Sequence, residues 1–444
     1  MKLFLWIVGI AFFTSSADIF LVFDIGGTLR LAQIMMLLVI VGALGQILQS
    51  RRILWPRGAT ALSVWCIFQA LLLPLSKALS PSVQLYLLLI FTVAGVFAMV
   101  QIFGNSSQTE TLMKLYLYSF IFMMFFGVFQ FVAPALHLGK PLIQQWIKYG
   151  LLPRINGFSY EPSYFATYMF LGWIMLLDLR IQKARIVAGR GWYWAAIIMS
   201  LVLFLSTSRT AWVFMVLEGA ARAMPDFSRY VRLHLERVLR GSLRIALPRL
   251  KVLLILFALV MAPLVALTAV STIVDPSIFL AGTGINNSTA HSLNDRVNTY
   301  YDTLTIIEKN PWIGRGIGGV PEGIAEIRGH RVVSVADLKA YWGFPVPFEV
   351  FAASGVIGFI PFLMFFWALT RGESKLIREN WEDERAKWLH ALVRAFVFEW
   401  LVLLADQNLL RVYLWFHVTM LMIVGYNLRY ALPAKVPAES LVIA

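Results

Sequence analysis

The chain has 444 residues, of which 59% are hydrophobic and 14% are charged. Soluble domains are about half apolar and a quarter charged, so this composition excludes an ordinary soluble protein. The formal net charge of +14 would suit nucleic acid, but no basic stretch is interleaved with aromatic residues on a polar domain, so no nucleic-acid partner is expected. The single cysteine, Cys66, excludes an internal disulfide.

About twelve apolar segments predict membrane-spanning helices, since a bilayer needs about 20 apolar residues per helix. They cover residues 3–23, 30–49, 59–78, 83–103, 112–135, 163–179, 192–206, 209–224, 251–274, 346–370, 391–405 and 409–429. We therefore expect an all-α, polytopic integral membrane protein, with residues 1–444 in one membrane domain. Residues 1–23 resemble a signal peptide, but the spans that follow favour an uncleaved first helix.

The distribution of lysine and arginine predicts the orientation of these spans. Linker 51–57 carries three arginines, 180–190 carries four Lys/Arg and 222–251 carries eight, whereas 275–345 has six Lys/Arg and seven Asp/Glu. An excess of lysine and arginine marks cytoplasmic loops. Alternating spans then place both termini inside and put 275–345, between spans 9 and 10, outside as one long periplasmic loop.

Two further non-spanning segments have a recognisable pattern. Residues 136–162, outside, hold three prolines and an apolar run, 142–152, that is too short to span. This predicts a short re-entrant or interfacial helix. Residues 225–249, inside, alternate arginines with apolar residues at helical spacing. This predicts an amphipathic helix on the inner leaflet, with a solvated linker as the alternative.

Apolar residues at helical spacing predict a helix over 293–307 of the long loop, and Asn310-Pro311 is expected to end it. The glycine-rich residues 314–319 predict a tight turn. They faintly resemble a phosphate-cradling loop but lack the preceding strand and the following Lys-Ser/Thr, so a structural turn is favoured. The residues up to Pro345 look irregular.

Charged residues at the predicted outer helix ends are the candidates for chemistry, because charges beside a bilayer are costly. They are Arg154, Glu161, Arg209, Arg296, Arg315, Glu349, Asp406 and Arg411. The arginines among them suggest an anionic ligand, since guanidinium groups match phosphate oxygens with two parallel hydrogen bonds. The alternative is that each arginine pairs with a carboxylate or reaches the lipid headgroups.

Three of these residues have informative surroundings. Arg209 follows a polar turn between two short spans, so it is expected at the outer rim of the bilayer. Arg296 borders the apolar face of the loop helix and would project beneath it, toward the membrane domain. Glu161 precedes Pro162 at the mouth of a span, where partial desolvation suits a carboxylate to proton abstraction. The alternative for Glu161 is a helix N-terminal acid favoured by the macrodipole.

His291 is a second candidate base or ligand, but neither it nor His330 has metal-ligand spacing. The loop acids are too scattered for a Mg²⁺ or Ca²⁺ site, so no metal or other cofactor is expected. The loop aromatics Trp312, Tyr341 and Trp342 suit either stacking on sugar rings or anchoring at the membrane interface.

Three local motifs occur in order: RINGFSYEPSYFA at 154–166, STSRTAW at 206–212, and Arg296 followed by PWIGRGIG at 311–318. Together with the span count and the long loop, they resemble the bacterial O-antigen polymerase (Wzy-type)/O-antigen ligase superfamily over roughly residues 150–370. The resemblance implies a GT-C-like membrane fold in the bacterial inner membrane. It also implies a metal-independent glycosyltransferase whose donor and acceptor are undecaprenyl-diphosphate-linked glycans on the periplasmic side.

By motif position, Arg209 and Arg296 would contact the diphosphate and glycan, and Arg154 would be a third contact. Tyr160, Arg315 and His291 are further binding candidates. Membrane lipid and a chain-length regulator protein are the further partners expected.

Ligases of this superfamily carry His followed by Asn, Ser or Gln, then nine residues, then Gly-x-x-Gly. Here Gly355–Gly358 supplies the ending, but Phe344-Pro345 stands where the His pair belongs. A polymerase is therefore favoured over a ligase, and the general base is left open between Glu161 and, second, His291. A flippase or transporter for lipid-linked sugars is the alternative of another class. Such proteins usually show repeated halves and mid-bilayer charges.

Overall fold

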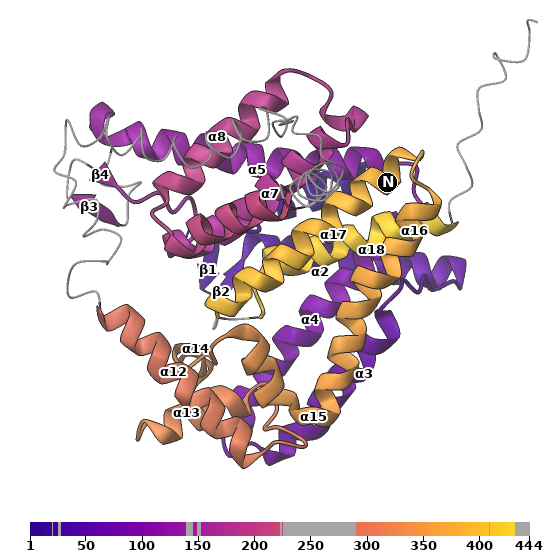
Figure 1. Ribbon diagram of the computed structural model, residues 1–444. Coiled ribbons are helices and arrows are strands. Elements are labelled where there is room, and N and C mark those ends of the chain that lie inside the picture. The colour runs from indigo at the N-terminus through magenta and orange to yellow at the C-terminus, as the bar shows by residue number, and fades with distance from the viewer. Residues whose placement is uncertain are drawn as a thin grey trace, which may run out of the picture.

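The computed structural model describes residues 1–19, 21–24, 28–138, 145–148, 152–222, 224, 290–407 and 409–430. Within these residues the chain is almost entirely helical, as predicted, with two small antiparallel strand pairs (Figure 1). The first half contains α1 (Lys2–Phe13), β1 (Val22–Asp24), β2 (Thr28–Arg30), α2 (Leu31–Ser50), α3 (Ala59–Leu72), η1 (Leu73–Leu75), α4 (Leu79–Phe103), α5 (Thr109–Val132), η2 (Ala133–Leu136), β3 (Trp146–Lys148), β4 (Leu152–Pro153), α7 (Pro162–Ile181), η3 (Arg185–Val187), α8 (Gly191–Leu205) and a helical stretch, 209–222. The second half contains α12 (Ala290–Lys309), α13 (Gly319–Ile327), α14 (Val335–Ala340), α15 (Val346–Trp367), η4 (Ala368–Gly372), α16 (Glu373–Glu379), α17 (Glu384–Val402), η5 (Leu403–Ala405) and α18 (Val412–Tyr430).

Six described helical segments are long and apolar enough to cross a membrane. They are Leu31–Ser50, Leu79–Phe103, Thr109–Leu136, Pro162–Ile181, Val346–Glu379 and Glu384–Ala405. The other apolar helices fall short, at Lys2–Phe13, Ala59–Leu75 and Gly191–Leu205. The chain is thus compatible with a membrane protein of several spans, while the full set of twelve stays a prediction. The predicted span 251–274 and the helix 225–249 lie outside the described residues, as do residues 275–289 of the loop.

The predicted first span, 3–23, is wrong in its extent, because α1 ends at Phe13. The hydroxyl of Thr14 donates a hydrogen bond to the carbonyl of Ile10 at 2.8 Å, and the next three residues turn away. Serine and threonine compete with the helix backbone in this way. The chain continues into the β1–β2 hairpin.

The helix predicted within 136–162 is also wrong in the part that is described. Trp146–Lys148 and Leu152–Pro153 form an antiparallel strand pair instead, with an irregular register. Prolines restrict the residue before them to extended backbone, and this effect overrides the short apolar run.

In the long loop, the predicted helix is confirmed as α12, which ends at Lys309, one residue before Asn310-Pro311. The glycine turn is confirmed as well: Gly314 and Gly316 have φ values of 70° and 77°, and the backbone N–H of Gly316 donates to the carbonyl of Ala353 at 2.9 Å. A side chain at Gly314 would collide with the backbone of α15, so the turn serves packing. The residues after the turn are not irregular as predicted, because they form α13 and α14.

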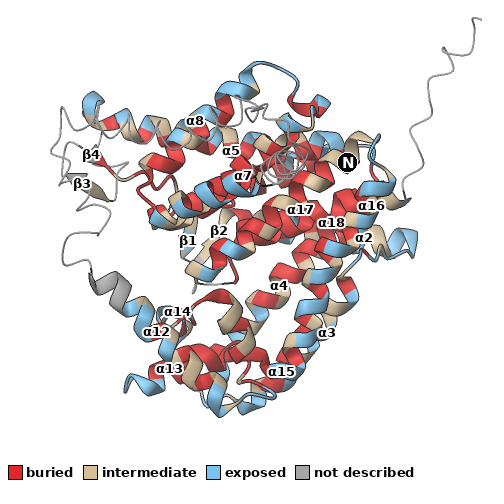
Figure 2. Cartoon of the chain, in the orientation of Figure 1, coloured by how far each residue is buried: buried red, intermediate tan, exposed pale blue. Residues whose placement is uncertain are grey.

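The helix ends gather into two groups, here called the outer and inner ends. At the outer end the backbone N–H of Ala78 donates to Glu322 at 2.7 Å, and that of Val346 donates to the carbonyl of Asp406 at 3.1 Å. At the inner end Arg385 donates to Asn427, and the backbone N–H of Arg185 donates to the carboxylate of Glu384. These contacts join several linkers predicted outside to one another and several linkers predicted inside to one another, while the alternating topology itself stays a prediction. Between them α7 and α18 are buried on nearly every side (Figure 2).

A partly buried group of ionisable side chains, the inner ion cluster, ties three helices together at the inner end. It consists of Asp178, Glu218, Arg222, His390 and Arg394. Arg394 donates two parallel hydrogen bonds, of 2.8 and 2.9 Å, to Glu218. Arg222 lies 2.6 Å from Glu218 and 3.2 Å from Asp178. The cluster therefore fixes stretch 209–222, which carries Arg209 at its opposite end, against α7 and α17.

Glu218→Ala is expected to lower the free energy of unfolding by about 3–5 kcal/mol, because Glu218 is fully buried and its loss leaves arginine charge unpaired. The matched control is Glu379→Ala, whose exposed pair with Lys375 should contribute within about 0.5 kcal/mol. Thermal unfolding of the two purified proteins in one detergent measures the difference. Equal losses in both variants would contradict the structural role of the cluster.

Candidate functional site

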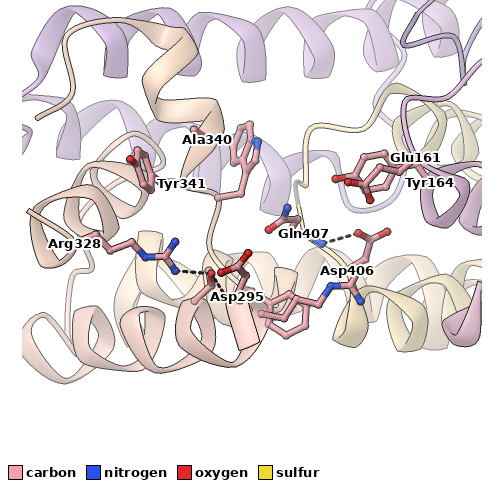
Figure 3. Close-up of a pocket in the computed structure, with 12 residues that line it drawn as sticks. Glu161, Tyr164, Asp295, Arg328, Ala340, Tyr341, Asp406 and Gln407 are labelled. Atoms are coloured by element: carbon pink, nitrogen blue, oxygen red, sulfur yellow. Dashed lines mark hydrogen bonds between the residues drawn. The ribbon is translucent and has the colours of Figure 1, made fainter. Parts of the chain in front are cut away.

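A cavity of about 400 Å³ opens at the outer end, between the membrane helices and the α12–α14 segment (Figure 3). Its membrane wall consists of Glu161, Tyr164, Asp406 and Gln407. Its loop wall consists of Asp295, Arg296, Thr299, Arg328, Ala340, Tyr341, Trp342 and Phe344. Two segments far apart in the sequence thus face each other across one polar pocket.

Glu161 stands at the N-terminal boundary of α7, in extended backbone, directly before Pro162. Its side chain makes no capping hydrogen bond to the first turn. Instead one carboxyl oxygen accepts a hydrogen bond from the hydroxyl of Ser163 at 3.0 Å, and the group lines the pocket. The macrodipole alternative stays open, because a carboxylate at the N-terminus of a helix is favoured without a capping hydrogen bond. Glu161 lines the pocket, so a ligand there can contact it.

Asp406 is the second carboxylate of the membrane wall and lies in the link between η5 and α18. It is 5% exposed. One oxygen accepts the backbone N–H of Gln407 at 2.8 Å, and the other accepts the hydroxyl of Thr167 at 3.3 Å. Burial raises the pKa of Asp406, while Arg411 and Arg296 act in the opposite direction. The site therefore holds a carboxyl group that takes up a proton more readily than a solvated one.

Arg411 contacts Tyr164 of the membrane wall but does not itself line the pocket. Its guanidinium lies 3.3 Å from Asp18 and 3.2 Å from the centre of the Tyr164 ring. Asp18 also pairs with Arg30 at 2.7 Å. These contacts join the start of α2, the residues after α1 and the start of α18. Arg411 therefore holds the ring of Tyr164 in a fixed orientation.

Arg154 and Arg209, here called the arginine rim, interact electrostatically with each other, and Arg154 interacts in the same way with Glu161. Arg154 donates to the hydroxyl of Thr207 at 2.8 Å and to Gln145 at 3.1 Å. Burial lowers the pKa of Arg154, and Glu161 and Arg209 are both close enough to influence it. Arg209 itself is exposed at the start of stretch 209–222. The rim thus offers one anchored and one accessible guanidinium beside the pocket.

The structure brings together most of the residues predicted from the sequence. Glu161 and Arg296 line the pocket, Arg296 interacts electrostatically with Asp406, and the arginine rim adjoins Glu161. Tyr160 directly precedes the pocket residue Glu161 in the sequence, but its side chain is exposed and does not line the pocket. The side chain of His291 lies outside the described residues.

Arg315 is placed elsewhere. It pairs with Glu326 at 3.2 Å and lies 3.9 Å from Glu322. Glu322 in turn accepts hydrogen bonds from Ser76 and from the backbone of Ala78. Arg315 therefore ties the glycine turn to α13, and Glu322 joins α13 to the turn before α4. The pairing alternative stated for each arginine is the one that the structure favours here.

Sequence reasoning did not single out Arg328, Asp295 or Thr299 as site residues. Arg328 donates to Asp302 at 2.8 Å and to Thr299 at 2.7 Å. The signal for Arg328 in the sequence is weak, since it follows α13, a segment that looks irregular in the sequence. Asp406 is an outer charge by sequence, but its position in the chain indicates no role.

The charges that line the pocket are mixed: three carboxylates, from Glu161, Asp295 and Asp406, face two guanidiniums, from Arg296 and Arg328. Among the described residues, no group of three or more His, Cys, Asp or Glu is arranged to hold a metal ion. The pocket suits a polar ligand that both donates and accepts hydrogen bonds, and the rim suits an anion. No protein-family model matches the chain, and no curated protein is significantly similar to it.

Proposed function

We propose that this chain is a membrane glycosyltransferase that polymerises undecaprenyl-diphosphate-linked oligosaccharide repeat units at the periplasmic face of the bacterial inner membrane. The observation that carries the proposal is the arginine rim standing beside a carboxylate-lined pocket at the outer helix ends. Arg154 and Glu161 come from one of the three motifs noted in the sequence, Arg209 from the second and Arg296 from the third. One or more residues from each motif thus lie in or near the pocket, whereas the run 311–318 of the third motif packs against α13 and α15.

The proposed reaction uses the two parts of the site differently. The lipid-borne diphosphate lies at the arginine rim, where guanidiniums stabilise the charge that develops as the diphosphate leaves the anomeric carbon. A hydroxyl of the second glycan attacks that carbon from the pocket, forming the new glycosidic bond. Its proton passes to a carboxylate of the membrane wall, Glu161 or Asp406. Undecaprenyl diphosphate and the lengthened, lipid-linked glycan are the products.

The ligase alternative is weakened by Phe344. This residue stands where the ligases carry their histidine, and its ring lines the pocket. An apolar ring at that place supplies no base, so a ligase would need one of the carboxylates of the membrane wall as a substitute.

The transporter alternative has one observation in its favour. Glu399 is fully buried in α17, and neither of its carboxyl oxygens has a hydrogen-bond partner among the described residues. Intramembrane carboxyl groups mark proton or ion paths in many transporters. The polar pocket at the outer end, with the arginine rim near Glu161, still favours the enzyme.

Reconstitution tests the proposal directly. Purified protein in lipid vesicles would receive lipid-linked repeat units from the host, without nucleotide or added metal, and the products would be resolved by gel and mass spectrometry. We expect a ladder with a spacing of one repeat unit. If folded protein makes no ladder but attaches the glycan to added lipid A-core, the chain is a ligase. Movement of lipid-linked sugar across the vesicle without a new bond would identify a transporter.

A further inference from the structure

We propose that the loop wall of the pocket is a binding subsite for an uncharged sugar ring of the acceptor glycan. The inference rests on the proposed function, which it deepens by assigning the acceptor side of the site and the class of sugar that it takes. Four observations carry it: the aromatic lining, a fixed guanidinium, the balance of charge and the position of the rim.

The loop aromatics, for which the sequence left sugar stacking and membrane anchoring both open, lie in two different environments in the structure. Tyr341 and Trp342 line the pocket, and Trp342 is only 9% exposed. Tyr341 is held on its other side by the ring of His330, whose centre lies 5.8 Å away in a stacked arrangement. Trp312, by contrast, is 67% exposed and is not part of the lining. Rigid aromatic faces inside a pocket suit the C–H faces of a sugar ring, whereas Trp312 suits a lipid interface.

Arg328 provides hydrogen-bond donors at a fixed position. Its Nε donates to Asp302 and its second amino group donates to Thr299, so two of its donors are already engaged. Figure 3 shows the remaining part of the guanidinium beside Asp295 and below Tyr341. A donor and an acceptor held next to an aromatic face are the arrangement that recognises adjacent sugar hydroxyls. Because both are anchored before binding, little conformational entropy is lost.

The charge balance selects an uncharged ligand. The pocket is lined by three carboxylates and two guanidiniums, and Arg328 is further neutralised by its ion pair with Asp302. With Asp302 included, the loop wall carries two carboxylates and two guanidiniums, so a sugar that bears a carboxylate would meet no net positive charge there, whereas hydroxyl groups can pair with either sign. In the proposed function the anionic part of the substrates lies at the arginine rim, outside the loop wall.

The position of the rim assigns the loop wall to the acceptor. The donor's diphosphate is tied to a polyprenyl chain in the bilayer and must stay near the membrane wall. A second glycan can then approach the anomeric carbon only from the opposite side, which is the loop wall on α12 and α14.

Binding of a lipid-free sugar tests the subsite without any catalysis. The probe is the repeat-unit oligosaccharide released from the host's lipid-linked intermediate by mild acid, titrated against the purified full chain and followed by saturation-transfer NMR. Trp342→Ala and Tyr341→Ala are each expected to weaken binding about tenfold, and Trp312→Ala should bind as the unchanged protein does. The same oligosaccharide with a primary hydroxyl oxidised to a carboxylate should bind more weakly than the original.

Thermal unfolding identifies any variant that fails to fold, and Tyr341→Ala decides the matter if Trp342→Ala does not fold. Unchanged affinity in the folded variants would overturn the subsite, as would tighter binding of the oxidised sugar. A protein that binds the oligosaccharide through Trp342 but makes no polymer would refute the proposed function while leaving the subsite in place. If the unchanged protein makes polymer but the folded variants bind the sugar as tightly as it does, the subsite is refuted and the proposed function stands.

Discussion

Replacing Arg209 or Arg296 with alanine is expected to slow polymer formation by about a hundredfold or more, the usual effect of removing one group that stabilises developing charge. Arg209 is the accessible guanidinium of the rim, and Arg296 reaches the pocket from the loop side beside Asp406. Because the two arginines lie at different places, the two variants should slow the reaction for different reasons. Loss of Arg209 should slow the departure of the diphosphate, and loss of Arg296 should disturb the alignment of the reacting groups. Initial rates of ladder formation by the purified variants measure both effects.

Two further variants make this experiment specific. Arg378→Ala removes an exposed arginine at the inner end and should leave the rate unchanged. Arg209→Lys keeps the positive charge but loses the planar fork, so it should recover only part of the activity. Full-length polymer at normal rates from folded Arg209→Ala and Arg296→Ala proteins would show that the proposed site is wrong.

Much of this fold could be predicted from local sequence alone. α12 ends next to Asn310-Pro311 as expected, since a proline restricts its predecessor whatever surrounds it. The glycine turn has the positive φ values that glycine tolerates best. The early end of α1 was missed because averaging hydropathy over residues 3–23 hides the consecutive hydroxyl residues at Thr14–Ser16.

The site was harder to predict because its partners are distant in the sequence. Arg315 stands in a glycine-rich run and is a binding candidate by sequence, yet Glu322 and Glu326 from the following helix neutralise it. Asp406, in the link before α18, accepts a hydrogen bond from Thr167 of α7, which is far away in the sequence. Its role therefore could not be predicted from the local sequence. Local patterns identify the charged side chains that lie beside a membrane. Tertiary packing decides which of these side chains pair with another charge of the protein and which can contact a ligand.

Asp406→Asn is expected to reduce polymer formation by about 10²–10⁴-fold, the range for loss of a general base. Asparagine keeps an oxygen that can accept the backbone N–H of Gln407, so the link before α18 should retain its shape. Burial raises the pKa of Asp406, and a base must be ionised to accept the acceptor's proton. Activity of the unchanged protein should therefore rise with pH, with a midpoint above that of a solvated aspartate, and the Asn variant should lose this dependence.

Glu161→Gln distinguishes the two carboxylates of the membrane wall. The charged and titratable groups that interact with Asp406 are Glu161, Arg296, Glu399, Arg411, Tyr164 and Tyr413. Among these Glu161 adds negative charge, so its removal should make Asp406 easier to ionise and move the acidic limb of the pH–rate profile to lower pH. Asp406 is the expected base because it faces Arg296 of the loop wall, whereas Glu161 adjoins the arginine rim and the leaving diphosphate. If Glu161→Gln instead removes activity at every pH and Asp406→Asn only shifts the profile, the roles are reversed and Glu161 takes the proton.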